Sequence, residues 1–133
     1  MENTERVVRK FIEGIERGAY RDAFGLLAAD GKYTVIGTTA ASGTYNGRQD
    51  FFDNLVPILS TFVEGPTLTF QEPIVSGDRA AVLASGFGRG PTGPYDQPHY
   101  AFIMRVRGEE FAEVYEFMDT VMLETAVFGK RLE

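Results

Sequence analysis

The spacing of hydrophobic residues changes at Pro66, and this change constrains the fold more than any other feature of the sequence. Before Pro66, apolar residues recur every three or four positions, which is typical of helices that bury one face. After Pro66 they alternate with polar residues, as in strands with one buried face. Helices that come first, followed by consecutive strands, predict an α+β domain with an antiparallel sheet.

Three helices are expected before Pro66. The first covers residues 4–17, the second residues 20–28 and the third residues 48–62. Pro57 lies inside the third pattern and predicts a kink or a break there. A short β-rich stretch over residues 33–37 separates the second helix from the third. Three helices can cover only one face of a sheet.

Four antiparallel strands are expected after Pro66. Residues 99–107 and 110–118 form a hairpin whose tight turn is Gly108-Glu109. The run 88–98 holds three Gly and three Pro, so we expect an irregular loop there, either a gate beside a cavity or a plain connector. A curved sheet covered on one face gives a cone-shaped roll in which the three N-terminal-half helices enclose a cavity.

Composition sets the class of protein. The 133 residues, 44% of them hydrophobic, predict one domain over residues 1–133. The absence of Cys excludes disulfides and thiolate metal sites. A net charge of −6 argues against nucleic acid as a partner. No targeting segment or membrane-length apolar run is present, so we expect a cytoplasmic protein with no membrane partner.

Three stretches carry a family resemblance: residues 43–47 before Phe51, residues 100–107, and Glu116-Phe-Met-Asp-Thr120. Their order and spacing resemble SnoaL-like domains of the nuclear-transport-factor-2-like superfamily, which includes ketosteroid isomerases, limonene epoxide hydrolases and polyketide cyclases. The resemblance covers nearly the whole chain and implies the fold more than any activity, because this fold carries unrelated functions.

The resemblance does not extend to the residues that ketosteroid isomerases use. Phe11 stands where they have an oxyanion-donating Tyr, Gly37 where they have the general base, and Ala101 near their second donor. Isomerisation by that mechanism is therefore not expected.

The hairpin turn predicts which residues face each other. Simple pairing around Gly108-Glu109 places Phe102 opposite Tyr115 and Tyr100 opposite Phe117. These four aromatic residues then share the face that the helices cover, as core or as cavity wall. Asp119 follows on the same face.

Asp119 and His99 are the candidate catalytic residues. Among aromatic residues the pKa of Asp119 would rise, which suits a general base, and SnoaL-like cyclases have a catalytic Asp on a late strand. Asp119 also precedes a predicted helix over residues 120–128, which favours a capping role. His99, the only histidine, is either an exposed residue at a strand end or, with a β-bulge, a partner for Glu116 or Asp119.

The predicted substrate pocket is aromatic. Tyr33 and Tyr45 either orient a ligand through their hydroxyls or pack at an edge with the hydroxyl in water. We expect a small apolar, carbonyl-bearing ligand, with no metal or organic cofactor. The pocket is predicted to be lined by Phe11, Tyr33, Tyr45, Tyr100, Phe102, Tyr115 and Phe117.

Two readings of the function stay open. The chain is either an enzyme of proton transfer, cyclisation or dehydration, or a non-catalytic module that binds a ligand or a protein. A base with a hydrogen-bond donor in the cavity favours the enzyme. A homodimer is also expected, through an outer sheet face centred on Ala101, Ile103, Ala112 and Val114.

Overall fold

The computed structural model describes residues 2–132. It contains five helices and seven strands within that range. The helices are α1 (Glu2–Glu16), α2 (Tyr20–Phe24), α3 (Arg48–Asn54), α4 (Val56–Leu59) and α5 (Thr120–Ala126). The strands are β1 (Leu27–Val35), β2 (Gly43–Asn46), β3 (Glu64–Phe70), β4 (Ile74–Ser76), β5 (Arg79–Gly90), β6 (Gly93–Arg107) and β7 (Glu110–Phe117).

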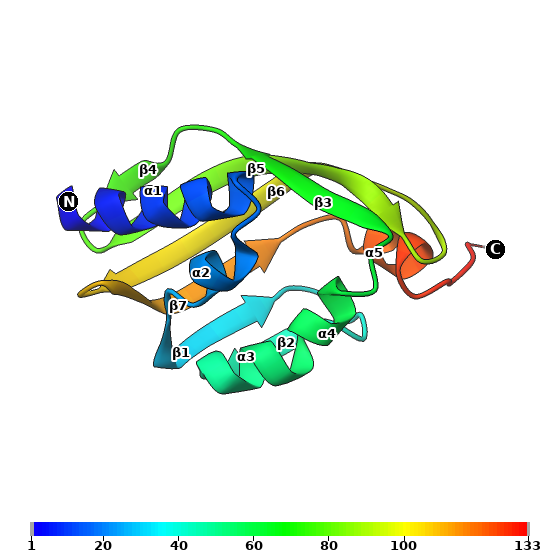
Figure 1. The fold of residues 1–133 in the computed structure, drawn as a ribbon, viewed down its shortest axis with the longest axis horizontal. Helices are drawn as coiled ribbons and strands as arrows, with labels where there is room; N and C mark the ends of the chain where they lie inside the picture. Colours follow the sequence, from blue (N-terminus) through cyan, green and yellow to red (C-terminus); the bar gives the residue numbers. More distant parts are fainter. Residues whose placement is uncertain (1, 133) are drawn as a thin grey trace.

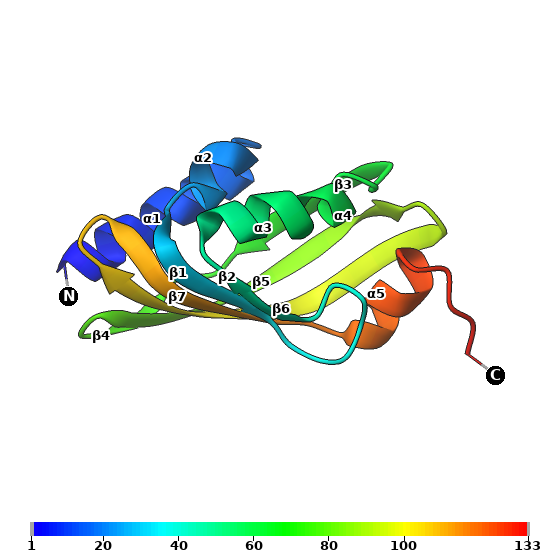
Figure 2. The same cartoon turned by 90° about the horizontal axis from the view of Figure 1, so that it is seen from below.

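All seven strands form one curved sheet in the order β2-β1-β7-β6-β5-β3, with β4 paired to β5 (Figure 1). Helices α1 to α4 lie on one face of this sheet, and α5 lies at the end where the chain finishes (Figure 2). Within the described part of the chain, no helix lies over the other face of the sheet. This is the α+β cone that the change of period predicts, with the N-terminal helices over a concave sheet.

Several local predictions are confirmed. The first helix ends at Glu16, before Gly18. Pro57 lies in the first turn of the separate short helix α4, so the third helical pattern is broken as expected. Strands β6 and β7 turn at Gly108-Glu109, and Gly108 has a positive φ of 63° that favours glycine.

The second helix and the first strand differ from the prediction. Helix α2 ends at Phe24, and β1 already begins at Leu27, where a helix was expected to continue. Leu27 pairs with Phe111 of β7, and both side chains are buried. The expected antiparallel sheet is therefore mixed, because β1 runs parallel to β7. Burial between two strands outweighed the short helical pattern.

The loop expected over residues 88–98 is wrong. This stretch is the end of a long β5–β6 hairpin, in which Gly90 pairs with Gly93. Tyr95 and Gln97 are buried and alternate with exposed neighbours, so the stretch does follow the period of a strand. Pro98 is tolerated because the β5–β6 register shifts beside it, and a bulge needs no regular ladder bond.

The β6–β7 register also differs from the prediction, and this difference moves the site. Arg107 pairs with Glu110 and Val106 with Phe111, as expected, but the next pair is Arg105 with Glu113. Ala112 is therefore the extra residue of a β-bulge. Because side chains alternate along a strand, one extra residue exchanges the two faces of the rest of β7.

After the bulge, Glu116 lies opposite Phe102, and Tyr115 lies opposite Ile103. Val114 is buried on the helix side, whereas Tyr115 and Phe117 are exposed on the opposite side. The predicted pairs Phe102–Tyr115 and Tyr100–Phe117 are thus wrong.

In residues 2–132, no helix is long and apolar enough to cross a membrane.

Candidate functional site

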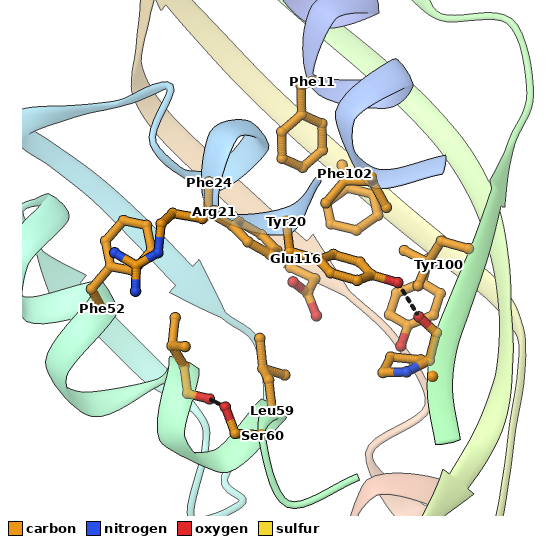
Figure 3. A pocket seen from close by; sticks show the side chains of 15 residues that line it. Phe11, Tyr20, Arg21, Phe24, Phe52, Leu59, Ser60, Tyr100, Phe102 and Glu116 are labelled. Atoms are coloured by element: carbon orange, nitrogen blue, oxygen red, sulfur yellow. Dashed lines mark hydrogen bonds between the residues drawn. The ribbon is translucent and has the colours of Figure 1, made fainter. Parts of the chain in front are cut away.

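A cavity of about 360 Å³ lies between the helices and the concave face of the sheet. Its wall is mostly aromatic and aliphatic, as the side chains in Figure 3 show. Contacts between aromatic edges and faces hold this wall: Phe11 packs on Phe24, Phe70, Phe102 and Phe111 with ring centroids 5.6–6.2 Å apart. The lining residues are Phe11, Ile15, Tyr20, Arg21, Phe24, Phe52, Val56, Leu59, Ser60, Gly65, Pro66, Leu68, Tyr100, Phe102 and Glu116.

Among residues 2–132, Glu116 is the only carboxyl residue in this wall, and it comes from the part of β7 that follows the bulge. Its carboxylate points into the middle of the cavity (Figure 3). It accepts a hydrogen bond from the hydroxyl of Tyr33, a buried residue of β1. Glu116 also lines a smaller hollow of about 40 Å³ beside the cavity, together with Tyr33 and Tyr100.

Burial raises the pKa of Glu116 to about 7, although the hydrogen bond from Tyr33 acts in the opposite direction. The first effect is larger because the apolar surroundings penalise the charged form. A carboxyl with a pKa near neutral exists in both protonation states near pH 7. It can therefore accept a proton in one step and return it in the next.

Two further hydroxyls belong to residues that line the same small hollow as Glu116. Those of Tyr95 and Tyr100 are 2.5 Å apart and share a hydrogen bond. Burial raises the pKa of Tyr95 to about 12 and that of Tyr100 well above 10, and the negative charge of Glu116 acts in the same direction on both. Both phenols therefore stay protonated at neutral pH, so they can donate hydrogen bonds.

Asp119 lies at the start of α5 and not in the wall of the cavity. Its carboxylate is exposed and accepts a hydrogen bond of 2.9 Å from the backbone N–H of Val121, which makes it the N-cap of α5. The amide of the buried Gln97 fixes the same junction, because it bonds both the N–H and the C=O of Asp119. The predicted face was wrong because the bulge at Ala112 shifts the register.

His99 is exposed on β6. The β-bulge that would have brought His99 to the cavity side does occur, but it does not move His99 there. Pro98 and His99 both lie on the outer side, whereas Gln97 and Tyr100 both face inward. The structure therefore does not bring His99 together with Glu116.

The predicted pocket residues lie in several different places. Phe11, Tyr100 and Phe102 line the cavity, and Tyr33 lines the adjoining hollow. Tyr45 is partly buried and donates to the carbonyl of Ala41 at 2.6 Å, so it packs at the edge. The structure places two of them, Tyr115 and Phe117, on the outer face of the sheet.

Sequence reasoning missed Glu116 as the central group. If Ala112 is left out, Phe111, Val114 and Glu116 alternate with Glu113 and Tyr115, and this interrupted alternation is the sequence signal of the bulge. Neither Gly nor Pro marks the bulge. Within residues 2–132, no three His, Asp or Glu side chains cluster as ligands of a metal ion.

Comparison with known proteins supports the fold. No family model matches the sequence, and no curated protein is significantly similar to it. Solved structures do match: a nuclear-transport-factor-2-like protein of unknown function from Burkholderia pseudomallei is 19% identical, with a TM-score of 0.81, and the match covers 96% of this chain and 98% of that one.

Two further structures agree. A nuclear-transport-factor-2-like protein from Burkholderia thailandensis is 18% identical over 92% of this chain and 95% of that one, with a TM-score of 0.81. A protein with a ketosteroid isomerase-like fold from Catenulispora acidiphila, in complex with trimethylamine, is 20% identical over 92% of both chains, with a TM-score of 0.72. The chain therefore has the nuclear-transport-factor-2-like fold. The narrower SnoaL-like resemblance stays a prediction.

Proposed function

We propose that the protein binds a small apolar molecule carrying a carbonyl group and moves a proton on it, with Glu116 as the general base. The observation that carries this proposal is a carboxyl, held by Tyr33, inside a cavity whose wall is mostly apolar and aromatic. The volume of about 360 Å³ suits a molecule of two or three fused rings.

The chemistry follows from the groups present. Glu116 removes a proton from the carbon next to the carbonyl, and the negative charge moves to the carbonyl oxygen. The hydroxyl of Tyr100, polarised by Tyr95, donates a hydrogen bond to that oxygen as the charge develops. Protonated Glu116 then gives the proton back. In an isomerisation the proton goes to another carbon, and in a dehydration it goes to the hydroxyl that leaves as water.

The alternative is a non-catalytic module on the same fold. A wall of Phe, Leu and Val alone would favour that reading. A carboxyl with a pKa of about 7 and a donor in contact favours an enzyme, because it combines a base with a group that orients it.

Proton exchange on the ketone 2-tetralone in deuterated water tests the proposal. We expect the wild-type protein to accelerate loss of the α-proton NMR signal, with a rate that rises with pH through about 7 as Glu116 ionises. Glu116→Gln should lower the accelerated rate on the order of a hundredfold. Glu13→Gln, at an exposed position on α1, is the matched control and should leave the rate unchanged. Equal rates for wild type and Glu116→Gln, with 2-tetralone bound to both, would favour the non-catalytic module.

We also propose that a second copy of the chain covers the outer face of the sheet. Five large apolar residues are 36–53% exposed there, and cross-strand pairing aligns Leu83 with Ala101 and Phe117, and Ile103 with Tyr115. Two residues of the predicted interface, Ala101 and Ile103, are still part of this proposed contact face, whereas Val114 belongs to the core. The five residues are Leu83, Phe87, Ile103, Tyr115 and Phe117.

Light scattering tests this prediction. At tens of micromolar we expect twice the chain mass of 14.7 kDa, because an apolar sheet face of this kind is costly to expose. Ile103→Asp should halve the measured mass without loss of the fold, since its side chain is 42% exposed in the single chain. A wild-type mass of one chain would contradict the proposal.

A further inference from the structure

Among residues 2–132, one cationic side chain lines the cavity, that of Arg21 in α2, and it lies at the rim. Its guanidinium carbon lies 5.6 Å from the centre of the Phe52 ring, an attractive cation–π arrangement that holds the group beside the opening (Figure 3). Arg21 is exposed, and within residues 2–132 its guanidinium forms neither a salt bridge nor a hydrogen bond. Its N–H donors are therefore free to bind a ligand.

Arg21 and Glu116 lie apart in the cavity. In the view of Figure 3, Arg21 and Phe52 are on one side, Tyr100 is on the other, and Glu116 lies between them. The space between is lined by apolar side chains such as Phe24 and Leu59. The cavity thus offers a cation at its rim, an apolar middle and an acid–base group within.

We infer that Arg21 binds a carboxylate at the outer end of the ligand, so that the natural ligand is an apolar carboxylic acid rather than a neutral ketone alone. A guanidinium held by an aromatic ring can bind a carboxylate through two parallel hydrogen bonds. The negative charge stays at the rim, away from Glu116, because two carboxylates in the apolar interior would repel each other. The inference rests on the proposed function, since it names the ligand class of the same cavity.

Two naphthyl compounds of nearly equal shape test the inference. They are 2-naphthylacetate, which is an anion, and 2-naphthylacetamide, which is neutral. Calorimetric titration at pH 6 keeps Glu116 mostly protonated, so its charge does not obscure the comparison. We expect the wild-type protein to bind the carboxylate about tenfold more tightly than the amide, because an arginine pair adds a charge-assisted bond.

Arg21→Gln should remove this preference. The variant should bind the carboxylate about tenfold more weakly, and its affinity for the amide should change by less than about twofold. Arg21→Lys should keep part of the preference. Arg17→Gln is the matched control, because it removes the same charge from an exposed position that does not line the cavity, and it should leave the preference intact.

The outcomes separate the two proposals. If Arg21→Gln keeps the full preference for the carboxylate, or if the wild-type protein has none, the role of Arg21 is overturned while the cavity proposal stands. If neither compound binds the wild-type protein, the cavity proposal is overturned, and the inference with it.

Discussion

The free energy of unfolding of Glu116→Gln, compared with that of the wild type, should increase as the pH rises. In the wild type, burial raises the pKa of Glu116 from 4.5 to about 7. The folded state therefore holds a proton that the unfolded state has released between these two values. Stability from this group is fully present below pH 4.5 and is lost as the pH rises through about 7. Glutamine has no such loss.

The expected effect is large for one substitution. Between pH 5 and pH 8 the free energy of unfolding of Glu116→Gln should gain about 2 kcal/mol on the wild type. Urea denaturation at four pH values measures it, with Glu13→Gln as the control for an exposed carboxyl. A difference between Glu116→Gln and wild type that does not change with pH would contradict this account.

Val114→Asp should prevent folding, whereas Tyr115→Asp should leave a folded chain. Val114 is 1% exposed, and its strand neighbours are Met104 and Tyr33, so an aspartate there would be a buried charge without a partner. The cost is at least about 4 kcal/mol, comparable to the whole stability of many domains. Tyr115, the next residue, is 36% exposed on the other face.

Circular dichroism and thermal melting of the two variants measure the result. The two variants together test the bulge at Ala112, because strand pairing without the bulge would put Tyr115 in the core and Val114 on the exposed face. A folded Val114→Asp with an unfolded Tyr115→Asp would restore the simple hairpin register and remove Glu116 from the cavity.

The parts of the fold that were predictable depend on short-range patterns. The helical spacing of Val7, Phe11 and Ile15, the break at Pro57 and the turn at Gly108-Glu109 each involve residues close in sequence. The parallel pairing of β1 with β7 joins segments about 80 residues apart, which no local pattern announces. The long β5–β6 hairpin was hidden because its Gly and Pro residues are typical of loops.

The site was predictable only in part, because one bulge decides which side chains enter the cavity. The aromatic wall follows from composition and from the inward positions of Phe11 and Phe102. Ala112 exchanges the faces of the rest of β7, which puts Glu116 inside the cavity, and Asp119, beyond the end of the strand, is exposed. Alanine fits a bulge as well as a regular strand, so the residue at the bulge does not itself mark this position.

We propose that Glu116 is a partly buried carboxyl that exchanges protons near neutral pH. NMR titration of protein labelled with ¹³C at the glutamate carboxyl carbons tests it most directly. One resonance should titrate with a pKa of about 7, and it should be absent from Glu116→Gln. If every glutamate carboxyl completes its titration below about pH 5.5, as ordinary exposed carboxyls do, Glu116 is not the proton-transfer group and the account is contradicted.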